Sequence, residues 1–240
     1  MGKIIQLKEL FDKEIAQKPN INLADYERSF KVFILYLNKY IQSSKTKTEP
    51  TELATQLYTD WKSWYNRGLD CNGVDIQYIP GRGLAPTAQG YRTKVLLLYP
   101  NSQIDVQIVY KGDTISYERT NNEVIYKYVA GDIFSKKEKV GAFCYINTNN
   151  ENNIQVFETL SLDEIANMRK ASKVSFTWNT WEDEMIRKSV IKRACKRLFN
   201  DGDLQDMMAD DNEKTGANFA EPAEEAKDDI IKEFKAKKKA

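Results

Sequence analysis

The sequence predicts an α+β protein with a small, mainly antiparallel sheet flanked by helices. Three observations support this fold class. Residues 3–65 repeat apolar side chains at helical spacing, and residues 104–160 contain five β-rich segments bounded by Gly, Asn and Asp. Residues 178–199 then read as one long helix rich in lysine and arginine. We therefore expect a helical N-terminal region, a central sheet and a long basic C-terminal core helix.

The N-terminal region is predicted to contain three helices. The first covers residues 3–17 and ends before Pro19, and the second covers residues 23–42. The third begins at Pro50 or Thr51 and ends at Gly68. Aromatic side chains recur along the third helix at helical spacing, which favours packing in the core or between subunits over stacking on nucleic-acid bases: Tyr58, Trp61, Trp64 and Tyr65.

The middle of the chain is predicted to consist mostly of strands. Residues 68–80 read as a turn followed by a short alternating strand, and residues 81–90 as a flexible Gly/Pro loop that carries Arg82. Residues 91–100 are compatible with a strand or with a short buried helix. Ser161 is expected to cap a helix over residues 162–171. Antiparallel strands are expected within residues 104–110, 111–118, 123–129, 140–146 and 154–160.

The helix predicted over residues 178–199 has a polarised charge pattern. Thr180 and Asp183 have the spacing of an N-terminal capping box. Lys196 and Arg197 lie near the negative end of the helix dipole, and three acids lie near its positive end: Glu182, Asp183 and Glu184. The same acids could form a divalent-metal site, but the helix dipole already accounts for them.

Two faces of this helix differ in chemistry. One face is apolar, although Arg187 falls within it: Val190, Ile191, Ala194, Cys195 and Leu198. The opposite face is basic: Lys188, Lys192, Arg193, Lys196 and Arg197. Acids occur only in the first turn, so the helix itself offers the later cations no partners. The basic face is therefore either an ordinary solvated surface or a binding face for phosphates spaced along a strand.

Composition disfavours several classes of enzyme. The chain has 41% hydrophobic and 30% charged residues, as expected of a globular protein. It contains no histidine, no GxxxxGK[ST] phosphate loop and no GxGxxG after a strand. These absences disfavour Ser-His-Asp and Cys-His catalysis, zinc bound by imidazole, and nucleotide-driven chemistry. A carboxylate nuclease that uses Mg²⁺ stays open. The main prediction is a protein that is not an enzyme and needs no cofactor, with Mg²⁺ at most a modulator.

The location expected is the cytoplasm. No apolar run approaches the roughly 20 residues that span a bilayer, so no membrane contact is expected. Residues 1–11 lack the hydrophobic core of a secretory signal. Cys71, Cys144 and Cys195 are odd in number and widely spaced, which fits a reducing compartment.

Charge divides the chain near Asn200. The first 200 residues contain 29 basic and 23 acidic residues, for a net charge of +6, whereas residues 201–240 contain 7 and 12, for −5. This asymmetry predicts a core over residues 1–200 that binds an anionic ligand. Residues 201–240 are predicted to form an acidic, largely disordered tail, with a short helix over residues 227–240.

Four ordered segments resemble the RecT family of phage and prophage single-strand annealing recombinases, of which the Redβ-like proteins are a part. The most specific is WNTWEDEMIRKSVIKRACK at 178–196, which is similar to the family's W-x-x-W-x-(D/E)-E-M-x-(R/K)-K-(S/T)-V-I-(K/R)-R-x-x-K helix. The others are GLDCNGVDIQYIP at 68–80, QGYRTKVLLLYPNS at 89–102 and IVYKGDTISYE at 108–118. Cys71 stands where the family usually has proline, and Thr93 stands in place of a glycine. The resemblance implies that residues 89–102 are helical.

The resemblance also implies a function. It implies a protein that binds single-stranded DNA and anneals it to a complement without ATP, as a ring or helical filament with a basic groove for the annealed duplex intermediate. The partners it implies are a second copy, a phage exonuclease and a host single-strand binding protein. A phage structural or assembly adaptor without annealing activity is the alternative. The candidate DNA-binding residues are Arg82, Tyr91, Arg92, Lys94, Lys111, Arg187, Lys188, Lys192, Arg193, Lys196 and Arg197. Trp178 and Trp181 are expected to pack in the protein and not to stack on bases.

Overall fold

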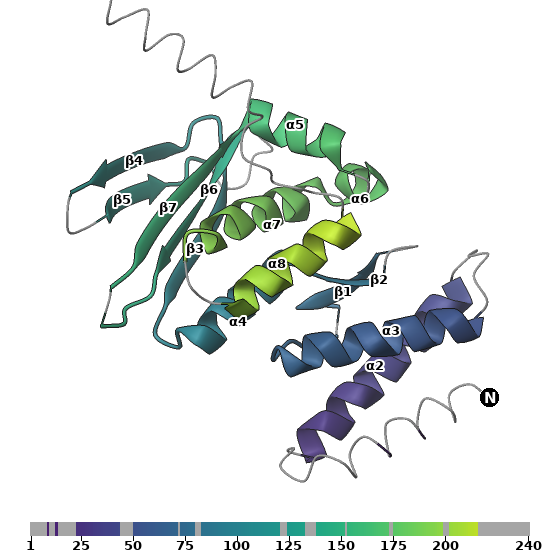
Figure 1. Cartoon of the computed structure of the whole chain (residues 1–240). Helices are drawn as coiled ribbons and strands as arrows, with labels where there is room; N and C mark the ends of the chain where they lie inside the picture. The colour runs from purple at the N-terminus through teal and green to yellow at the C-terminus, as the bar shows by residue number, and fades with distance from the viewer. Residues whose placement is uncertain are drawn as a thin grey trace, which may run out of the picture.

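The protein has the predicted mixed α+β architecture, with a helical N-terminal region and small antiparallel sheets (Figure 1). The fold is known from a computed structural model, which describes residues 9, 13, 23–43, 50–71, 73–79, 83–120, 124–132, 138–151, 153–172, 175–198 and 202–215. The helices predicted over residues 3–17 and 227–240 lie outside these ranges, apart from the helical residues Glu9 and Lys13. No helix among the described residues is long and apolar enough to cross a membrane.

From residue 23 onward, the described part of the N-terminal region contains α2 over Leu23–Ser43 and α3 over Pro50–Asn66. They meet through a buried aromatic cluster in which the Trp61 ring stacks on Phe33 at 5.5 Å and lies 5.4 Å from Phe30. Trp64 is also fully buried, and its indole nitrogen donates to the Leu84 carbonyl at 3.1 Å. The aromatic residues of α3 therefore pack in the core, as their spacing predicts.

A two-stranded sheet joins this region to the rest of the fold. Strand β1 (Ile76–Ile79) pairs antiparallel with β2 (Gly83–Pro86), so the loop predicted over residues 81–90 is wrong for β2. All four residues of β2 are buried, because α3 and α8 pack against this strand. Helix α4 (Ala88–Leu98) follows, with Thr87 as its N-cap. Of the two structures compatible with residues 91–100, the helix is the correct one.

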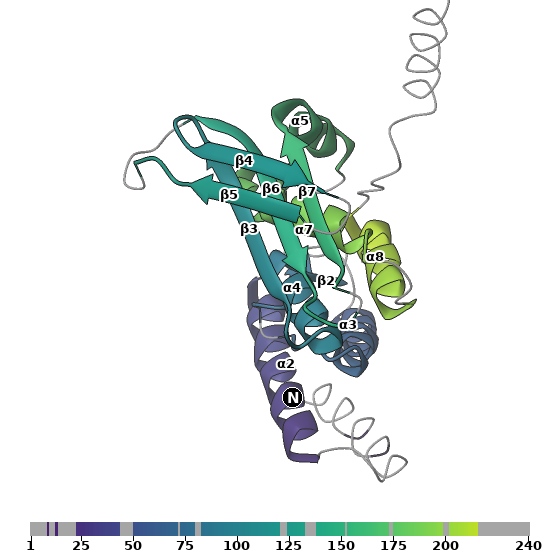
Figure 2. The same cartoon turned by 90° about the vertical axis from the view of Figure 1, so that its left-hand side faces the viewer.

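The central sheet has three antiparallel strands in the order β3-β6-β7: Gln103–Tyr110, Lys139–Asn147 and Gln155–Ser161. Strands β4 (Thr114–Arg119) and β5 (Val124–Val129) form a separate hairpin. Figure 2 shows this hairpin across one face of the sheet, with α7 on the opposite face. Aromatic side chains join hairpin and sheet, including Tyr117 stacked on Phe157 at 4.5 Å and Tyr126 against Tyr145 at 4.5 Å. The five predicted strands are confirmed, and they divide into two layers.

The capping box at Ser161 is present at the start of α5 (Leu162–Ala171). The Ser161 hydroxyl accepts from the Glu164 amide, and the Glu164 carboxylate accepts from the Ser161 amide at 2.8 Å. This local prediction is confirmed because all of its atoms lie within four residues of sequence.

The long helix predicted over residues 178–199 is two helices, α6 (Ser175–Thr180) and α7 (Glu182–Cys195). The chain leaves helical geometry at Trp181 (φ −130°, ψ 45°), which is the N-cap of α7 and makes no side-chain capping hydrogen bond. The capping role predicted for Thr180 is therefore wrong. Residues three apart on a continuous helix share a face. Trp178 and Trp181 are three positions apart, but the break at Trp181 places them in different environments. Trp178 is 2% exposed and Trp181 is 61% exposed.

The acidic tail predicted from residue 201 is wrong over residues 202–215, which form helix α8 (Gly202–Thr215). This helix has one buried face, made of Leu204, Met207, Met208, Asp211 and Thr215. These residues follow the three- and four-residue spacing of a helix, but only three of them are apolar and the acidic composition obscures the pattern. Helix α8 packs against β2, and its residue Asp211 contacts Lys188 and Lys192 of α7 (Figure 1).

Candidate nucleic-acid interface

Helix α7, which carries the basic motif, lies in the core of the protein. It packs against α4 and against all three strands of the central sheet. Its buried residues extend around much of its circumference and include two lysines: Met185, Ile186, Lys188, Ser189, Val190, Ile191, Lys192, Ala194 and Cys195. The predicted division into an apolar and a solvated basic face is therefore wrong for Lys188 and Lys192. The physical reason is that α8 covers the side of α7 that sequence periodicity assigns to solvent.

Lys188 and Lys192 share one buried carboxylate, that of Asp211 in α8. Each lysine Nζ lies 2.6 Å from a carboxylate oxygen, Lys188 from Oδ1 and Lys192 from Oδ2. The Tyr91 hydroxyl from α4 donates to Oδ2 at 2.9 Å. Asp211 is 0% exposed and Lys192 is 1% exposed. Three candidate DNA-binding residues, Tyr91, Lys188 and Lys192, are thus brought together by an acid that was absent from the predicted site.

Burial and charge act in opposite directions on this cluster. Burial alone would raise the pKa of Asp211, but the nearby charges of Lys188 and Lys192 and their hydrogen bonds lower it below its usual value. Burial lowers the pKa of Lys192 to about 8, because the attraction of Asp211 only partly offsets the loss of water and the repulsion from Lys188. Burial, together with the Asp211 charge, raises the pKa of Tyr91. Asp211 is therefore ionised, and two lysines compete for one anion.

The remaining cations of the basic motif lie nearer the surface, and the two arginines among them contact acids. Arg193 Nη1 lies 2.6 Å from Glu164 and donates to the Thr159 carbonyl at 3.0 Å. Arg197 Nε lies 2.9 Å from Glu158, and the arginine side chain is 61% exposed. Lys196 is half-buried at the turn that ends α7. The acids that pair these arginines come from β7 and α5, which sequence periodicity on α7 could not reveal.

The three acids at the start of α7 are bound to cations. Lys139 Nζ contacts both Glu182 and Asp183 at 2.5 Å, and Arg169 reaches Glu182 at 3.2 Å. Arg187 pairs with Glu184, three residues earlier on the same helix, at 2.6 Å. Arg187 is therefore partly exposed and paired at the surface, and is not a cation buried in an apolar stripe. Across the described parts of the chain, no group of three acidic, cysteine or histidine side chains is arranged to hold a metal ion.

The other candidates are dispersed. Lys94 on α4 is buried, and its Nζ donates to the Arg67 carbonyl at 3.1 Å. Lys111 is exposed beside the turn between β3 and β4 and lies 3.5 Å from Glu138. Arg82 lies outside the described residues.

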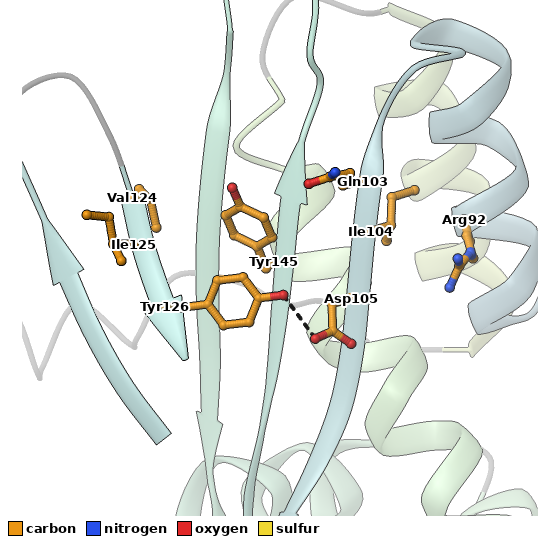
Figure 3. Close-up of a pocket in the computed structure, with 8 residues that line it drawn as sticks. All are labelled: Arg92, Gln103, Ile104, Asp105, Val124, Ile125, Tyr126 and Tyr145. Atoms are coloured by element: carbon orange, nitrogen blue, oxygen red, sulfur yellow. Dashed lines mark hydrogen bonds between the residues drawn. The ribbon is translucent and has the colours of Figure 1, made fainter. Parts of the chain in front are cut away.

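Arg92, on the exposed side of α4, borders a groove of about 630 Å³ between β3 and β5. Figure 3 shows Tyr126 reaching across this groove to Asp105, to which its hydroxyl donates at 3.0 Å. Burial, followed by the charge of Asp105 and the hydrogen bond to it, raises the pKa of Tyr126. Arg92 is therefore a predicted DNA-binding cation that lies beside a groove. Neither Asp105 nor Tyr126 was predicted at this site, because their contact joins residues 21 positions apart.

The fold and this arrangement define an α+β protein whose basic helix is a central core element with accessible cations at its margins. The model of the RecT family matches residues 89–230, which is more than half of the chain, and the chain belongs to this family. The matched range includes α4 from its second residue, the central sheet and every helix from α5 to α8, whereas the motif at 68–80 lies before it. No curated protein matches the chain. Membership places the protein among phage-type DNA recombination proteins that bind and anneal single-stranded DNA.

Proposed function

We propose that this protein binds single-stranded DNA without sequence preference and anneals it to a complementary strand without ATP. The observation that carries the proposal is the family match, which runs through the basic helix and its surroundings. The net charge of +6 on the first 200 residues supports an anionic ligand. On this proposal the protein is not an enzyme and needs no cofactor, and Mg²⁺ at most modulates binding.

The cations that remain accessible are proposed to contact the DNA backbone: Arg92, Lys111, Arg187, Arg193, Lys196 and Arg197. Surface ion pairs such as Arg197–Glu158 contribute at most about 1 kcal/mol, so a phosphate can replace the carboxylate at small cost. Phosphate contacts release counterions and carry no sequence information, which leaves the base edges free to pair. Base pairing then supplies the driving energy of annealing.

We also propose that the protein acts as a ring or helical filament of identical subunits. A row of subunits would multiply weak phosphate contacts along one strand and align many bases for pairing at once. Phe176 in the first turn of α6 and Trp181 between α6 and α7 are exposed aromatic residues, and we propose that they take part in packing between subunits. A phage exonuclease and a host single-strand binding protein are the proposed partners, and the cytoplasm is the proposed location.

The test is annealing of complementary oligonucleotides in the absence of ATP, with strand integrity checked on a denaturing gel. We expect duplex formation from intact strands, with an affinity for single-stranded DNA that falls roughly linearly on log–log axes as salt rises. Arg197→Ala should weaken binding and reduce the salt slope by about one unit. Arg28→Ala, which removes an exposed arginine of α2 far from the basic motif in sequence, is the matched control.

Two outcomes would contradict the proposal. Binding that is absent, or that does not change with salt, would instead support the structural adaptor. Cleaved strands that appear only with Mg²⁺ would support a carboxylate nuclease.

A further inference from the structure

Three hydrogen-bond donors converge on the Asp211 carboxylate, and they come from two different helices of the core. Lys188 and Lys192 project from α7, and Tyr91 projects from α4. The three donors lie within 2.9 Å of the carboxylate oxygens. All are excluded from water by the protein around them. Two ammonium groups and a hydroxyl around one anion are the donors expected of a phosphate-binding site.

The anion in this site belongs to a helix that is itself acidic. Helix α8 contains five acidic residues and one lysine over residues 202–215. The residue next to Asp211 makes a second contact of the same kind, because Arg67 Nη1 lies 2.5 Å from Asp210. The one lysine of α8, Lys214, contacts Asp60 at 2.8 Å and the Leu84 carbonyl at 2.9 Å. Helix α8 therefore bridges the N-terminal region and the basic helix, with carboxylates directed at cations of both.

We infer that Lys188, Lys192 and Tyr91 form a binding site for one backbone phosphate of single-stranded DNA, and that Asp211 of α8 occupies this site in the free protein. The inference rests on the proposed function and adds a regulation to it. A carboxylate and a phosphodiester each carry one negative charge and present two acceptor oxygens, so one can replace the other on the same donors.

Displacement of α8 has a cost that makes the site selective. Moving the helix would expose Leu204, Met207 and Met208, which are buried in the free protein. Binding of a single phosphate or a short oligonucleotide releases less free energy than the displacement of α8 costs. A long strand bound by many subunits releases more. Helix α8 would thus prevent the weak binding of single anions, and a DNA strand that is bound by many subunits would displace it.

Asp211→Asn tests the inference. Asparagine keeps the size of the side chain and one acceptor oxygen but removes the charge that competes with phosphate. We expect single-stranded DNA to bind at least tenfold more tightly than to the wild type, with a salt slope steeper by about one unit for each lysine that reaches a phosphate. Asp206→Asn is the matched control, since it removes one negative charge from an exposed position of the same helix and leaves the buried site intact.

Three results would overturn the inference. The first is an equal gain in both variants, which would indicate a general charge effect. The second is a gain that persists when Lys188→Gln and Lys192→Gln are added to Asp211→Asn. The third is an affinity of Asp211→Asn equal to or weaker than that of the wild type. If the wild type anneals DNA while any of these results is found, only the inference fails. If no protein binds DNA, the proposed function fails and the inference falls with it.

Hydrogen exchange on the wild-type chain decides the case in which Asp211→Asn does not fold. Saturation with a long single strand should increase amide exchange across residues 202–215 and leave α4 protected. Unchanged or stronger protection of α8 in the complex would overturn the inference.

Discussion

At the scale of single residues, Asp211 and Arg197 illustrate two different kinds of ion pair. Asp211 is fully buried and accepts from two lysines and a tyrosine, whereas Arg197 is 61% exposed beside Glu158. Removal of one charge from a buried ion pair leaves the other charge buried without compensation. The charges of a surface ion pair are screened by water. The same basic motif therefore contains lysines that are buried and paired in the free protein and an arginine that is accessible in it.

This difference predicts opposite stability effects along α7. Lys192→Ala should lower the free energy of unfolding by about 3 kcal/mol, because it leaves a buried carboxylate with one lysine in place of two. Arg197→Ala should change it by less than about 1 kcal/mol. Urea denaturation of both variants measures the difference. Equal stabilities would show that the Asp211 cluster is not buried in solution.

The two tryptophans of the basic motif should also behave differently. Trp178→Ala should destabilise the fold by about 3–5 kcal/mol, because its ring is 2% exposed. Trp181→Ala should cost less than about 1 kcal/mol, because its ring is 61% exposed. Thermal unfolding followed by far-ultraviolet circular dichroism tests this. A large loss for Trp181→Ala in a dilute, monomeric sample would contradict the break between α6 and α7.

At the scale of elements, the start of α5 combines a capping box with a contact between elements. Glu164 caps the helix through Ser161 and also pairs with Arg193 of α7 at 2.6 Å. Burial opposes ionisation, but the hydrogen bonds from Ser161 and Arg193 prevail and lower the pKa of Glu164 from 4.5. One carboxylate therefore links local helix initiation to the position of the basic helix.

A pH dependence of stability follows from the sign of this shift. Because the pKa is lower in the folded protein, the Glu164 contribution is present above pH 4.5 and is lost as pH falls through the folded pKa. Glu164→Gln should cost about 1 kcal/mol at pH 7, and less at strongly acidic pH, where the wild-type carboxyl group is also uncharged. The difference in unfolding midpoint between the wild type and the variant, taken at each of the two pH values, measures this cost. A cost that is the same at both values would exclude the capping role of the ionised carboxylate.

At the scale of the whole molecule, α8 belongs to the core and is not part of a dispensable tail. Its buried face packs Leu204, Met207 and Met208 into the main hydrophobic cluster, and Asp210 and Lys214 tie it to the N-terminal region. The family match also continues past it, to residue 230. The boundary expected at Asn200 therefore cuts through a packed unit.

Two truncations locate the true boundary. A chain that ends at Asn200 should lose several kcal/mol of stability, because three buried side chains and the partner of two buried lysines are removed. A chain that ends at Thr215 keeps every described contact of α8 and should unfold at nearly the wild-type urea concentration. Equal stability of the two truncated chains would contradict the packing of α8.

The sequence by itself determined the features whose atoms lie close together along the chain. The Ser161 capping box, the helical spacing of the α3 aromatics and the turn-bounded strands depend on neighbouring residues, so periodicity and capping chemistry were enough. The family could also be predicted, because its signature lies within 178–196. These are local rules of backbone geometry, and they hold before the chain is folded.

Only the tertiary structure decided which cations are available to DNA. Lys188, Lys192, Arg193 and Arg197 look alike on a helical projection, yet their acids lie 19 to 39 residues away on α8, α5 and β7. A helical period shows which side chains share a face, but not which other segment covers that face. Burial of a charge depends on the covering segment, and here an acidic helix buries two of the five cations that were expected on the surface.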